Sequence, residues 1–133
     1  MSMVGASQGG KGVDSLDDSR NAIEAARKLA LEVHTTVAVT GACDYVTDGQ
    51  TVIEIPGGHK MATWVVGTGC SLSALVAAFC AVSPSALTGC AAALTLAKRA
   101  QESAYLKSTG PGSFHNAYLD ALYQITVGAN PNA

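Results

Sequence analysis

Charged and aromatic side chains are scarce in this sequence. Of its 133 residues only 14% are charged and 5% aromatic, while 48% are hydrophobic, many of them alanine. The net charge is −2, from eight basic and ten acidic residues, so no surplus of positive charge exists to attract a nucleic-acid backbone or an anionic membrane. This composition excludes a disordered chain and favours a single domain with closely packed helices.

The sequence also lacks the runs that mark membrane-spanning and exported proteins. The longest stretch without a charge, residues 61–97, is interrupted by glycines and by Pro84. Its apolar pieces therefore fall short of the roughly 20 residues needed to span a bilayer. The first ten residues contain no basic segment followed by an apolar one, which predicts no secretory signal. We expect a cytoplasmic protein without nucleic-acid or membrane partners.

Cysteines are few, and their spacing gives little support for a metal site. The sequence has no C-x-x-C and no paired histidines near Cys43, Cys70, Cys80 or Cys90, so we assign no metal ligands. We expect Cys43, Cys80 and Cys90 to be free thiols buried as small hydrophobic residues. Cys70 differs because it directly follows a glycine motif.

Most other polar candidates have ordinary explanations. Asp44 and Asp48 are four residues apart and could share a strand face, but Asp48 is also the natural first residue of an Asp-Gly turn. Ser71 and Ser73 lack the G-x-S-x-G pattern of a hydrolase nucleophile. Three isolated histidines are more typical of surface or capping positions than of ligands: His34, His59 and His115.

The first third of the chain predicts a helix followed by short strands. After a glycine-rich and flexible lead-in over residues 1–14, Ser15 and Asp18 form a capping box for an amphipathic helix over residues 16–33. The β-branched run 35–42 predicts a short buried strand. Residues 44–55 predict a hairpin around the Asp48-Gly49 turn.

The rest of the chain predicts three helices. Residues 69–82 carry apolar groups on every side, which predicts a buried helix that ends at Ser83-Pro84. Helices over 86–107 and 113–127 follow, with a turn at 110–112 between them and a frayed tail over 128–133. The order indicates an α/β layer with too few strands for a complete parallel sheet, as in part of a larger fold.

Gly67-Thr68-Gly69-Cys70 is the motif most able to carry chemistry. Its glycines let backbone amides approach a ligand, and a helix beginning here adds unpaired N–H groups and the positive end of its dipole. Such an end can bind a phosphate or a developing oxyanion, and its field favours the thiolate of a first-turn cysteine. A short G-x-G alone is weak evidence, because glycines before a buried helix also serve packing, and judged from these residues alone a purely structural turn is the favoured explanation. Neither the P-loop pattern nor the Rossmann G-x-G-x-x-G is matched.

Five segments, in order, resemble the hydroxyethylthiazole kinase family of the ribokinase-like superfamily. The likeness covers the chain from about Val4 to Thr126. The segments are GGKGVDS (9–15), VAVTGACDYVTDG (37–49), GGHKM (57–61), VVGTGCSLSALVAAFCAV (65–82) and GPGSFHNAYLDALYQIT (110–126). The resemblance implies that residues 1–133 are the C-terminal portion of a kinase domain, with a partial ribokinase-like α/β fold of a short sheet, a hairpin and about four helices.

The family resemblance also implies an activity and its residues. The family uses ATP and Mg²⁺ to phosphorylate the hydroxyl of 4-methyl-5-(2-hydroxyethyl)thiazole in thiamine salvage. Cys70 matches the position at which most ribokinase-like kinases carry a catalytic aspartate. Gly67, Thr68 and Gly69 match the anion hole, Thr40 matches a nucleotide-contacting position, and Gly67 matches one that also touches the thiazole. Positioning and electrostatic stabilisation by a helix end suit phosphoryl transfer.

Two departures from the family matter. Its members are about twice this long, and their metal-binding Gly-Asn-x-x-Glu motif and most of their thiazole pocket lie in the half that this chain does not resemble. The ligands of Mg²⁺ are expected there. Trp64 stands where many relatives have lysine. Family active sites lie at the subunit contacts of a trimer, which implies a homo-oligomer here.

Two alternatives remain open beside the kinase hypothesis. The chain can be a non-catalytic fragment that folds as an oligomer or with a partner, because a half sheet leaves an edge and an apolar face uncovered. A sugar or pyrimidine kinase of the same superfamily is less well supported, since those enzymes usually carry aspartate at the position of Cys70.

Overall fold

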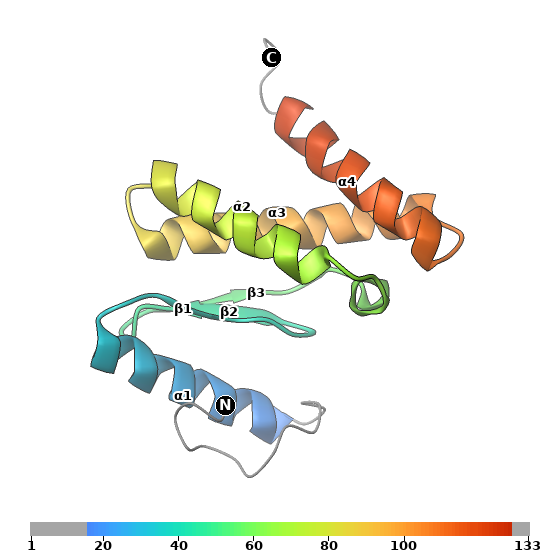
Figure 1. Cartoon of the computed structure of the whole chain (residues 1–133). Coiled ribbons are helices and arrows are strands. Elements are labelled where there is room, and N and C mark those ends of the chain that lie inside the picture. The colour runs from blue at the N-terminus through green and yellow to red at the C-terminus, as the bar shows by residue number, and fades with distance from the viewer. Residues whose placement is uncertain (1–15, 129–133) are drawn as a thin grey trace. The chain divides into compact units, whose positions relative to one another are not determined.

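The computed structural model describes residues 16–128 of the chain (Figure 1). The chain divides into two compact units, Met1–Glu54 and Ile55–Ala133, and each is described by itself. The expected lead-in over residues 1–14, the side-chain capping box and the tail after Gly128 lie outside the described residues. No helix in the described part is long and apolar enough to cross a membrane.

The described residues of the first unit form one helix and a small sheet, in the order that the sequence predicts. The sheet has the strand order β1-β2-β3, and α1 contacts both β1 and β2. The elements are α1 (Leu16–Val33), β1 (Val37–Val39), β2 (Asp44–Thr47) and β3 (Val52–Ile55).

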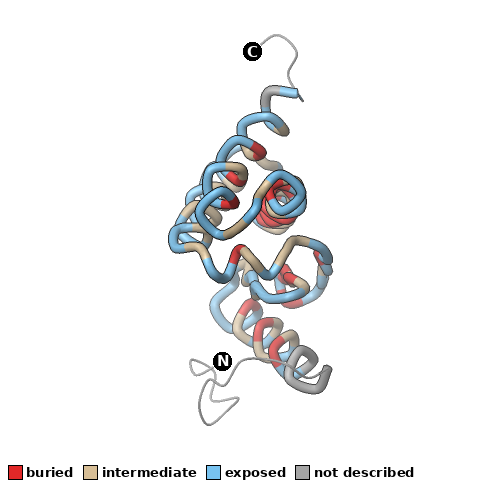
Figure 2. The backbone as a smooth tube through the Cα atoms, turned by 90° about the vertical axis from the view of Figure 1, so that its right-hand side faces the viewer, coloured by how far each residue is buried: buried red, intermediate tan, exposed pale blue. Residues whose placement is uncertain are grey.

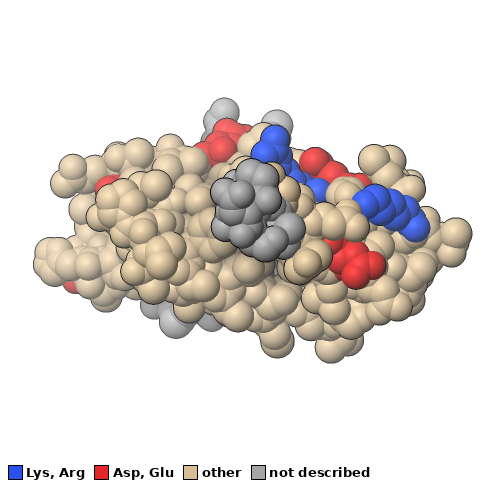
Figure 3. Space-filling view, turned by 90° about the horizontal axis from the view of Figure 1, so that it is seen from above, with Lys and Arg blue, Asp and Glu red and all other residues tan. Residues whose placement is uncertain are grey.

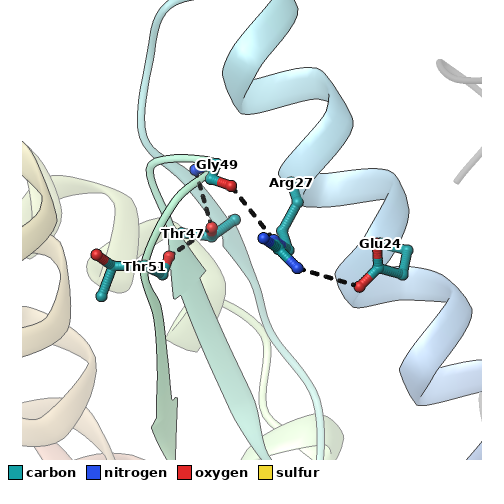
Figure 4. Close-up of polar contacts among 5 residues, drawn as sticks. All are labelled: Glu24, Arg27, Thr47, Gly49 and Thr51. Carbon is teal, nitrogen blue, oxygen red and sulfur yellow. Dashed lines mark hydrogen bonds and ion pairs between the residues drawn. The ribbon is translucent and has the colours of Figure 1, made fainter.

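Helix α1 spans the predicted residues 16–33. It ends because His34 adopts a left-handed backbone conformation, with φ of 51°. The Arg27 side chain connects the helix to the hairpin, since its Nε donates to the Gly49 carbonyl at 3.3 Å (Figure 4). One face of α1 is buried and is lined by alanines at four-residue spacing: Ala22, Ala26 and Ala30.

The predicted hairpin joins β2 to β3 through the Asp48-Gly49 turn, which confirms the sequence prediction. Asp48 Oδ1 accepts hydrogen bonds from the N–H groups of Gln50 at 2.9 Å and Thr51 at 2.7 Å. The Thr47 hydroxyl donates to the Thr51 carbonyl at 2.6 Å and accepts from the Gly49 N–H at 3.0 Å (Figure 4). These short-range bonds fix the turn, as an Asx turn does.

The predicted buried strand over residues 35–42 was wrong in its length and in its burial. β1 covers only Val37–Val39, and none of its residues is fully buried. It lies at the edge of the described sheet, antiparallel to β2, with Val37 opposite Thr47. An edge strand is covered on fewer sides than its neighbour, so the fully buried position falls on β2 at Val46.

The second unit is helical. Helix α3 contacts both α2 and α4, and α4 also contacts the short 3₁₀ helix η2. Phe114 and Tyr118 of α4 are fully buried in its core, together with small residues of α3 and η2: Ala100, Ala104 and Ala62. The elements are η2 (Lys60–Trp64), α2 (Thr68–Val82), α3 (Ala86–Lys107) and α4 (Pro111–Gly128).

The helix boundaries in this unit follow local capping signals. α3 spans the predicted residues 86–107, and Ser85 caps it by accepting from the Thr88 N–H at 3.2 Å. α4 begins at Pro111, two residues before the predicted start, because proline is well suited to the first helical position. The Phe114 N–H accordingly donates to the Gly110 carbonyl at 2.9 Å. Helix η2 was not predicted.

Helix α2 has the predicted bounds within one residue, but the prediction that it is buried was wrong. None of its residues is buried, whereas Figure 2 shows buried residues in red along other parts of the chain. An apolar sequence on every side predicts burial only if something covers every side, and in this unit α3 covers one side. Cys80 and Cys43 are likewise half-buried rather than core residues, whereas Cys90 is buried as predicted.

Candidate functional site

The N-terminus of α2 is a helix end without a side-chain cap. Gly67 occupies the capping position in a left-handed conformation, with φ of 101°, and supplies no capping side chain. The Ser71 N–H donates to the Gly67 carbonyl at 2.9 Å and is the first to join the helix ladder. The N–H groups of Thr68, Gly69 and Cys70 precede this bond, so helix geometry leaves them directed out of the helix end.

The two glycines of the motif have different structural explanations. Gly67 has a backbone conformation that side-chain-bearing residues rarely adopt. Gly69 is helical, and a Cβ added there would meet no atom within 4 Å. At Gly89, by contrast, an added Cβ would lie 2.8 Å from the Cys80 Cα, so close helix packing requires that glycine. Among the described residues, neither backbone conformation nor packing accounts for Gly69.

The hydroxyl groups around this helix end bond to the protein backbone. The Thr68 hydroxyl lies within hydrogen-bonding distance of the Ala62 carbonyl at 3.0 Å and the Val65 carbonyl at 3.3 Å. Ser71 and Ser73 donate to helix carbonyls one turn earlier, at 2.8 and 3.2 Å. Thr68 can therefore contribute to an anion hole through its N–H group, and the serines behave as ordinary helix residues.

Cys70 lies at the third position of α2, exposed and unpaired with any other cysteine. The first turn of α2 contains no acidic residue, so none of its own side chains opposes the positive end of the helix dipole. The arrangement can hold an anionic group beside an accessible sulfur atom. It has the form of a phosphate- or oxyanion-binding helix end.

The loop that precedes the site is anchored to α3. The Gly58 N–H donates to Glu102 Oε1 at 2.9 Å, and the His59 N–H donates to Gln101 Oε1 at 3.2 Å. His59 Nδ1 also accepts from the Met61 N–H at 3.2 Å and so caps η2, as the sequence predicts for a capping histidine. Sequence reasoning missed these anchors, since the partners are more than 40 residues apart; the adjacent glycines Gly57-Gly58 were the available signal.

The aromatic rings of this region belong to the loop before α2, to η2 and to α3. The His59 ring is stacked on Tyr105 of α3, with centroids 3.5 Å apart. Trp64 ends η2 with 58% of its surface exposed, and the Lys60 ammonium lies 5.8 Å from its ring centroid. A cation thus lies beside this exposed aromatic residue.

The remaining predicted site residues belong to the first unit. Thr40 is exposed just after β1. Asp44 is buried at 4% exposure, and its Oδ1 accepts from the Gly41 N–H at 2.8 Å. Asp48 lies in the exposed hairpin turn, so the suggestion that both carboxylates share a strand face was wrong. Hydrogen bonds from Thr51 and then Gln50 lower the pKa of Asp48.

The metal expected for a kinase has no ligand set in this part of the chain. Within residues 16–128 no group of three or more His, Cys, Asp or Glu side chains is placed to hold a metal ion. The donors near the α2 N-terminus are N–H groups, which suit an anion and not a cation. The described residues therefore fit a phosphate group but not Mg²⁺ on their own.

One unit holds an antiparallel sheet packed on α1, and the other is a set of helices in which α2 has an uncapped, glycine-led N-terminus. These elements define an α/β protein. The hydroxyethylthiazole kinase family matches residues 1–128, and the chain belongs to this family.

Individual relatives agree with this assignment. Hydroxyethylthiazole kinases from Escherichia coli O1:K1 / APEC and from E. coli strain K12 / MC4100 / BW2952 are each 51% identical over 126 residues. That match covers 95% of this chain and 48% of each relative. The solved hydroxyethylthiazole kinase from Pyrococcus horikoshii OT3 is 41% identical, with a TM-score of 0.77, over 81% of this chain and 42% of that one. The chain spans about half the length of the curated relatives it matches.

Proposed function

We propose that this chain forms the phosphoryl-transfer end of a hydroxyethylthiazole kinase. The reaction transfers the γ-phosphoryl group of ATP to the hydroxyl of 4-methyl-5-(2-hydroxyethyl)thiazole in thiamine salvage, in the cytoplasm where ATP is supplied. The observation that carries the proposal is the open space over Gly69, at a helix end with no side-chain cap. Because no side chain at Gly67 or Gly69 covers this helix end, a phosphate group can approach its N–H groups closely.

The helix end supplies the electrostatic part of the mechanism. As the alcohol oxygen forms a bond to the γ-phosphorus, the bond to the bridging oxygen of ATP breaks and ADP leaves. The negative charge lies on the oxygens of the transferring group, and the N–H groups of Thr68, Gly69 and Cys70 are directed to meet it. Mg²⁺, when bound, neutralises phosphate charge, and its ligands belong to the half of the fold that this chain does not span.

Cys70 takes the alcohol proton in this mechanism. Its exposed sulfur, in a first helical turn that contains no acidic residue, is placed to accept the proton as the oxygen attacks. A thiolate is a weaker base than an alkoxide, so the proton does not leave before the attack; it transfers to the sulfur as the forming P–O bond makes the alcohol oxygen more acidic. On the basis of the family resemblance, we assign Thr40 to contact the nucleotide. We assign Gly67 to contact the thiazole as well as the phosphate.

The experiment uses this chain alone and this chain fused behind the N-terminal half of the E. coli relative. ATP-dependent phosphorylation of the thiazole alcohol is followed by mass spectrometry. We expect activity in the fused protein and a loss of about a hundredfold or more with Cys70→Ala. Cys80→Ala, ten residues further along α2, is the matched control and should keep the activity. If the Cys70→Ala variant kept full activity, Cys70 would not be the proton acceptor.

A second candidate function is supported by the exposure of α2. The chain can act as a non-catalytic piece that completes its fold in a homo-oligomer, such as a trimer, or with a partner, because none of the α2 residues is buried. Calorimetric titration of the isolated chain with ATP and Mg²⁺ separates the two. Binding supports a chain that holds nucleotide by itself, whereas no heat at millimolar ATP, with a multimeric mass by light scattering, supports the second.

A further inference from the structure

Ser71 is hydrogen bonded to two of the three peptide groups that form the candidate anion hole. Its N–H donates to the Gly67 carbonyl at 2.9 Å, and its hydroxyl donates to the Thr68 carbonyl at 2.8 Å. The Gly67 carbonyl shares a peptide plane with the Thr68 N–H, and the Thr68 carbonyl shares one with the Gly69 N–H. Each bond therefore fixes the direction of one N–H group that the proposed function assigns to the phosphate.

The candidate anion hole has no charged side chain on its own helix. No residue of α2 is charged, and in the view from above the charged side chains occupy limited areas of the surface (Figure 3). The peptide N–H groups thus carry the interaction, and their direction and donor strength matter. A hydrogen bond accepted by a peptide carbonyl polarises the peptide and strengthens its N–H as a donor. The Ser71 hydroxyl therefore both orients and strengthens the Gly69 N–H.

A buried hydroxyl group of α4 lies beside Ser71. Tyr118 is 1% exposed and belongs to the core of this unit. Burial raises the pKa of Tyr118, and an interaction with the Ser71 side chain opposes that rise, so the two hydroxyls are neighbours. Among the residues that the structure describes, the Tyr118 hydroxyl oxygen is nevertheless the one buried side-chain polar atom without a hydrogen-bond partner. Such an atom is rare in a protein core and needs a specific explanation.

We infer that Ser71 and Tyr118 are positioning residues for phosphoryl transfer, acting through the N–H groups of the anion hole. This inference rests on the proposed function, because it concerns the same site. Negative charge at the Gly69 N–H polarises its peptide, so the Thr68 carbonyl attracts the Ser71 hydroxyl proton more strongly. The Ser71 oxygen then becomes a better acceptor, and the Tyr118 hydroxyl has a proton to donate to it. The completed chain of hydrogen bonds stabilises the charge of the transferring group from inside the protein.

Removal of the Ser71 hydroxyl tests the first member of this chain. The variants are made in the chain fused behind the N-terminal half of the E. coli relative, and kcat and KM are measured for the thiazole alcohol. We expect Ser71→Ala to lower kcat about fivefold and to change KM less than about twofold, because the anion hole meets charge that develops in the transition state. Ser71→Thr keeps a hydroxyl and should restore most of kcat.

Thr95→Ala is the matched control for Ser71→Ala. It removes a hydroxyl that donates to the Ala91 carbonyl of α3 at 2.8 Å, which is the same kind of helix bond at a distance from the anion hole in sequence. We expect this variant to keep the kcat of the parent. An unchanged kcat in Ser71→Ala overturns the inference, and so does an equal loss in Thr95→Ala.

A double-mutant cycle tests whether Tyr118 acts through Ser71. Tyr118→Phe removes the hydroxyl and keeps the buried ring. We expect it to lower kcat about threefold when Ser71 is present and to have no effect in the Ser71→Ala background. Tyr123→Phe, at an exposed position of α4, is the control and should keep kcat. An unchanged kcat in Tyr118→Phe, or an equal loss in both backgrounds, overturns the inference.

Stability distinguishes positioning from packing at Tyr118. Its hydroxyl has no hydrogen bond to lose, so the free energy of unfolding of the Tyr118→Phe chain in urea should equal or exceed that of the parent. A residue that only packs would lose activity together with stability. A lower kcat with undiminished stability therefore supports the inference, whereas a parallel loss of both overturns it.

The fused parent protein separates this inference from the proposed kinase function. If the parent does not phosphorylate the thiazole alcohol, the proposed function fails, and calorimetric titration with ATP then tests the anion hole. Weaker ATP binding by Ser71→Ala supports orientation of the hole by Ser71, and unchanged binding overturns it. A parent that phosphorylates the alcohol, with full kcat retained in Ser71→Ala, overturns this inference alone. A parent that does not bind ATP overturns both.

Discussion

The Thr68 hydroxyl lies 3.0 Å from the carbonyl oxygen of Ala62, which connects the first residue of α2 to η2. Ala62 is buried in the core that α3 and α4 form with η2. The helix end that carries the candidate phosphate site is thereby joined through one side chain to the core of its unit.

Removal of this hydroxyl should loosen the start of α2. Thr68→Val keeps the shape of the side chain and leaves the Ala62 carbonyl without this donor. We expect the free energy of unfolding in urea to fall by about 1 kcal/mol. Thr68→Ser, which retains a hydroxyl, is the control and should lose less. Equal stability of the valine variant and the parent chain would show that the bond contributes nothing to stability.

The two glycines of the motif should respond in opposite directions to alanine. Gly67→Ala forces a side chain into a left-handed conformation and should lower the free energy of unfolding by about 1–2 kcal/mol. Gly69→Ala enters open space within a helix and should raise it by up to about 1 kcal/mol. Thermal and urea unfolding measure both effects.

The same Gly69→Ala variant should impair nucleotide binding. The added methyl group occupies the space in which a phosphate approaches the N–H groups of the helix end. We expect the affinity for ATP, measured by calorimetry on the fused kinase, to fall while stability is maintained. A variant that is more stable and binds ATP as tightly as the parent would indicate that Gly69 is not part of a ligand site.

Acid should weaken the hairpin turn through Asp48. Its pKa is lowered from the ordinary 3.8 by hydrogen bonds from Thr51 and Gln50, so the folded state favours the carboxylate. The contribution of this group to stability is present above its unfolded pKa and is lost as the pH falls through the lower folded pKa. Asp48→Asn keeps an acceptor oxygen but cannot titrate, so its unfolding free energy should change less between pH 5 and pH 2. A pH dependence identical to that of the parent would exclude Asp48 as a source of acid sensitivity.

The four cysteines should react with iodoacetamide in an order set by their exposure. Cys70 is exposed, Cys43 and Cys80 are half-buried, and Cys90 is buried. Burial, and to a lesser degree the nearby Cys80, raises the pKa of the Cys90 thiol, which reduces its thiolate fraction further. Peptide mapping after brief alkylation near pH 8 should show Cys70 modified first and Cys90 last. Early modification of Cys90 would contradict its placement in the core.

Local sequence signals determined the elements whose ends are fixed by nearby residues. The apolar period of residues 16–33 and the Asp48-Gly49 turn each act within a few residues, and the structure confirms both. The predicted bounds of α3 are also confirmed, and the structure adds the Ser85 cap at its start. The start of α4 was predicted two residues late because Pro111 belongs to both a turn signal and a helix start.

The sequence could not determine features that depend on distant residues. Helix η2 depends on a loop held by Gln101 and Glu102, more than 40 residues away, and on the His59 cap. The Thr68 hydroxyl faces the Ala62 carbonyl, a backbone atom that no side-chain pattern reveals.

The sequence by itself determined the element order, the glycine-led helix end and the family resemblance, because each depends on residue types in a fixed order along the chain. Only the tertiary structure decided which glycine the fold requires and which sides of α2 are covered. The pattern of α2 is apolar on every side. Such a pattern predicts that the helix is buried, but it does not show which elements cover it. Helix α3 covers one side of α2, and the residues on the opposite side, between Gly69 and Val82, are exposed.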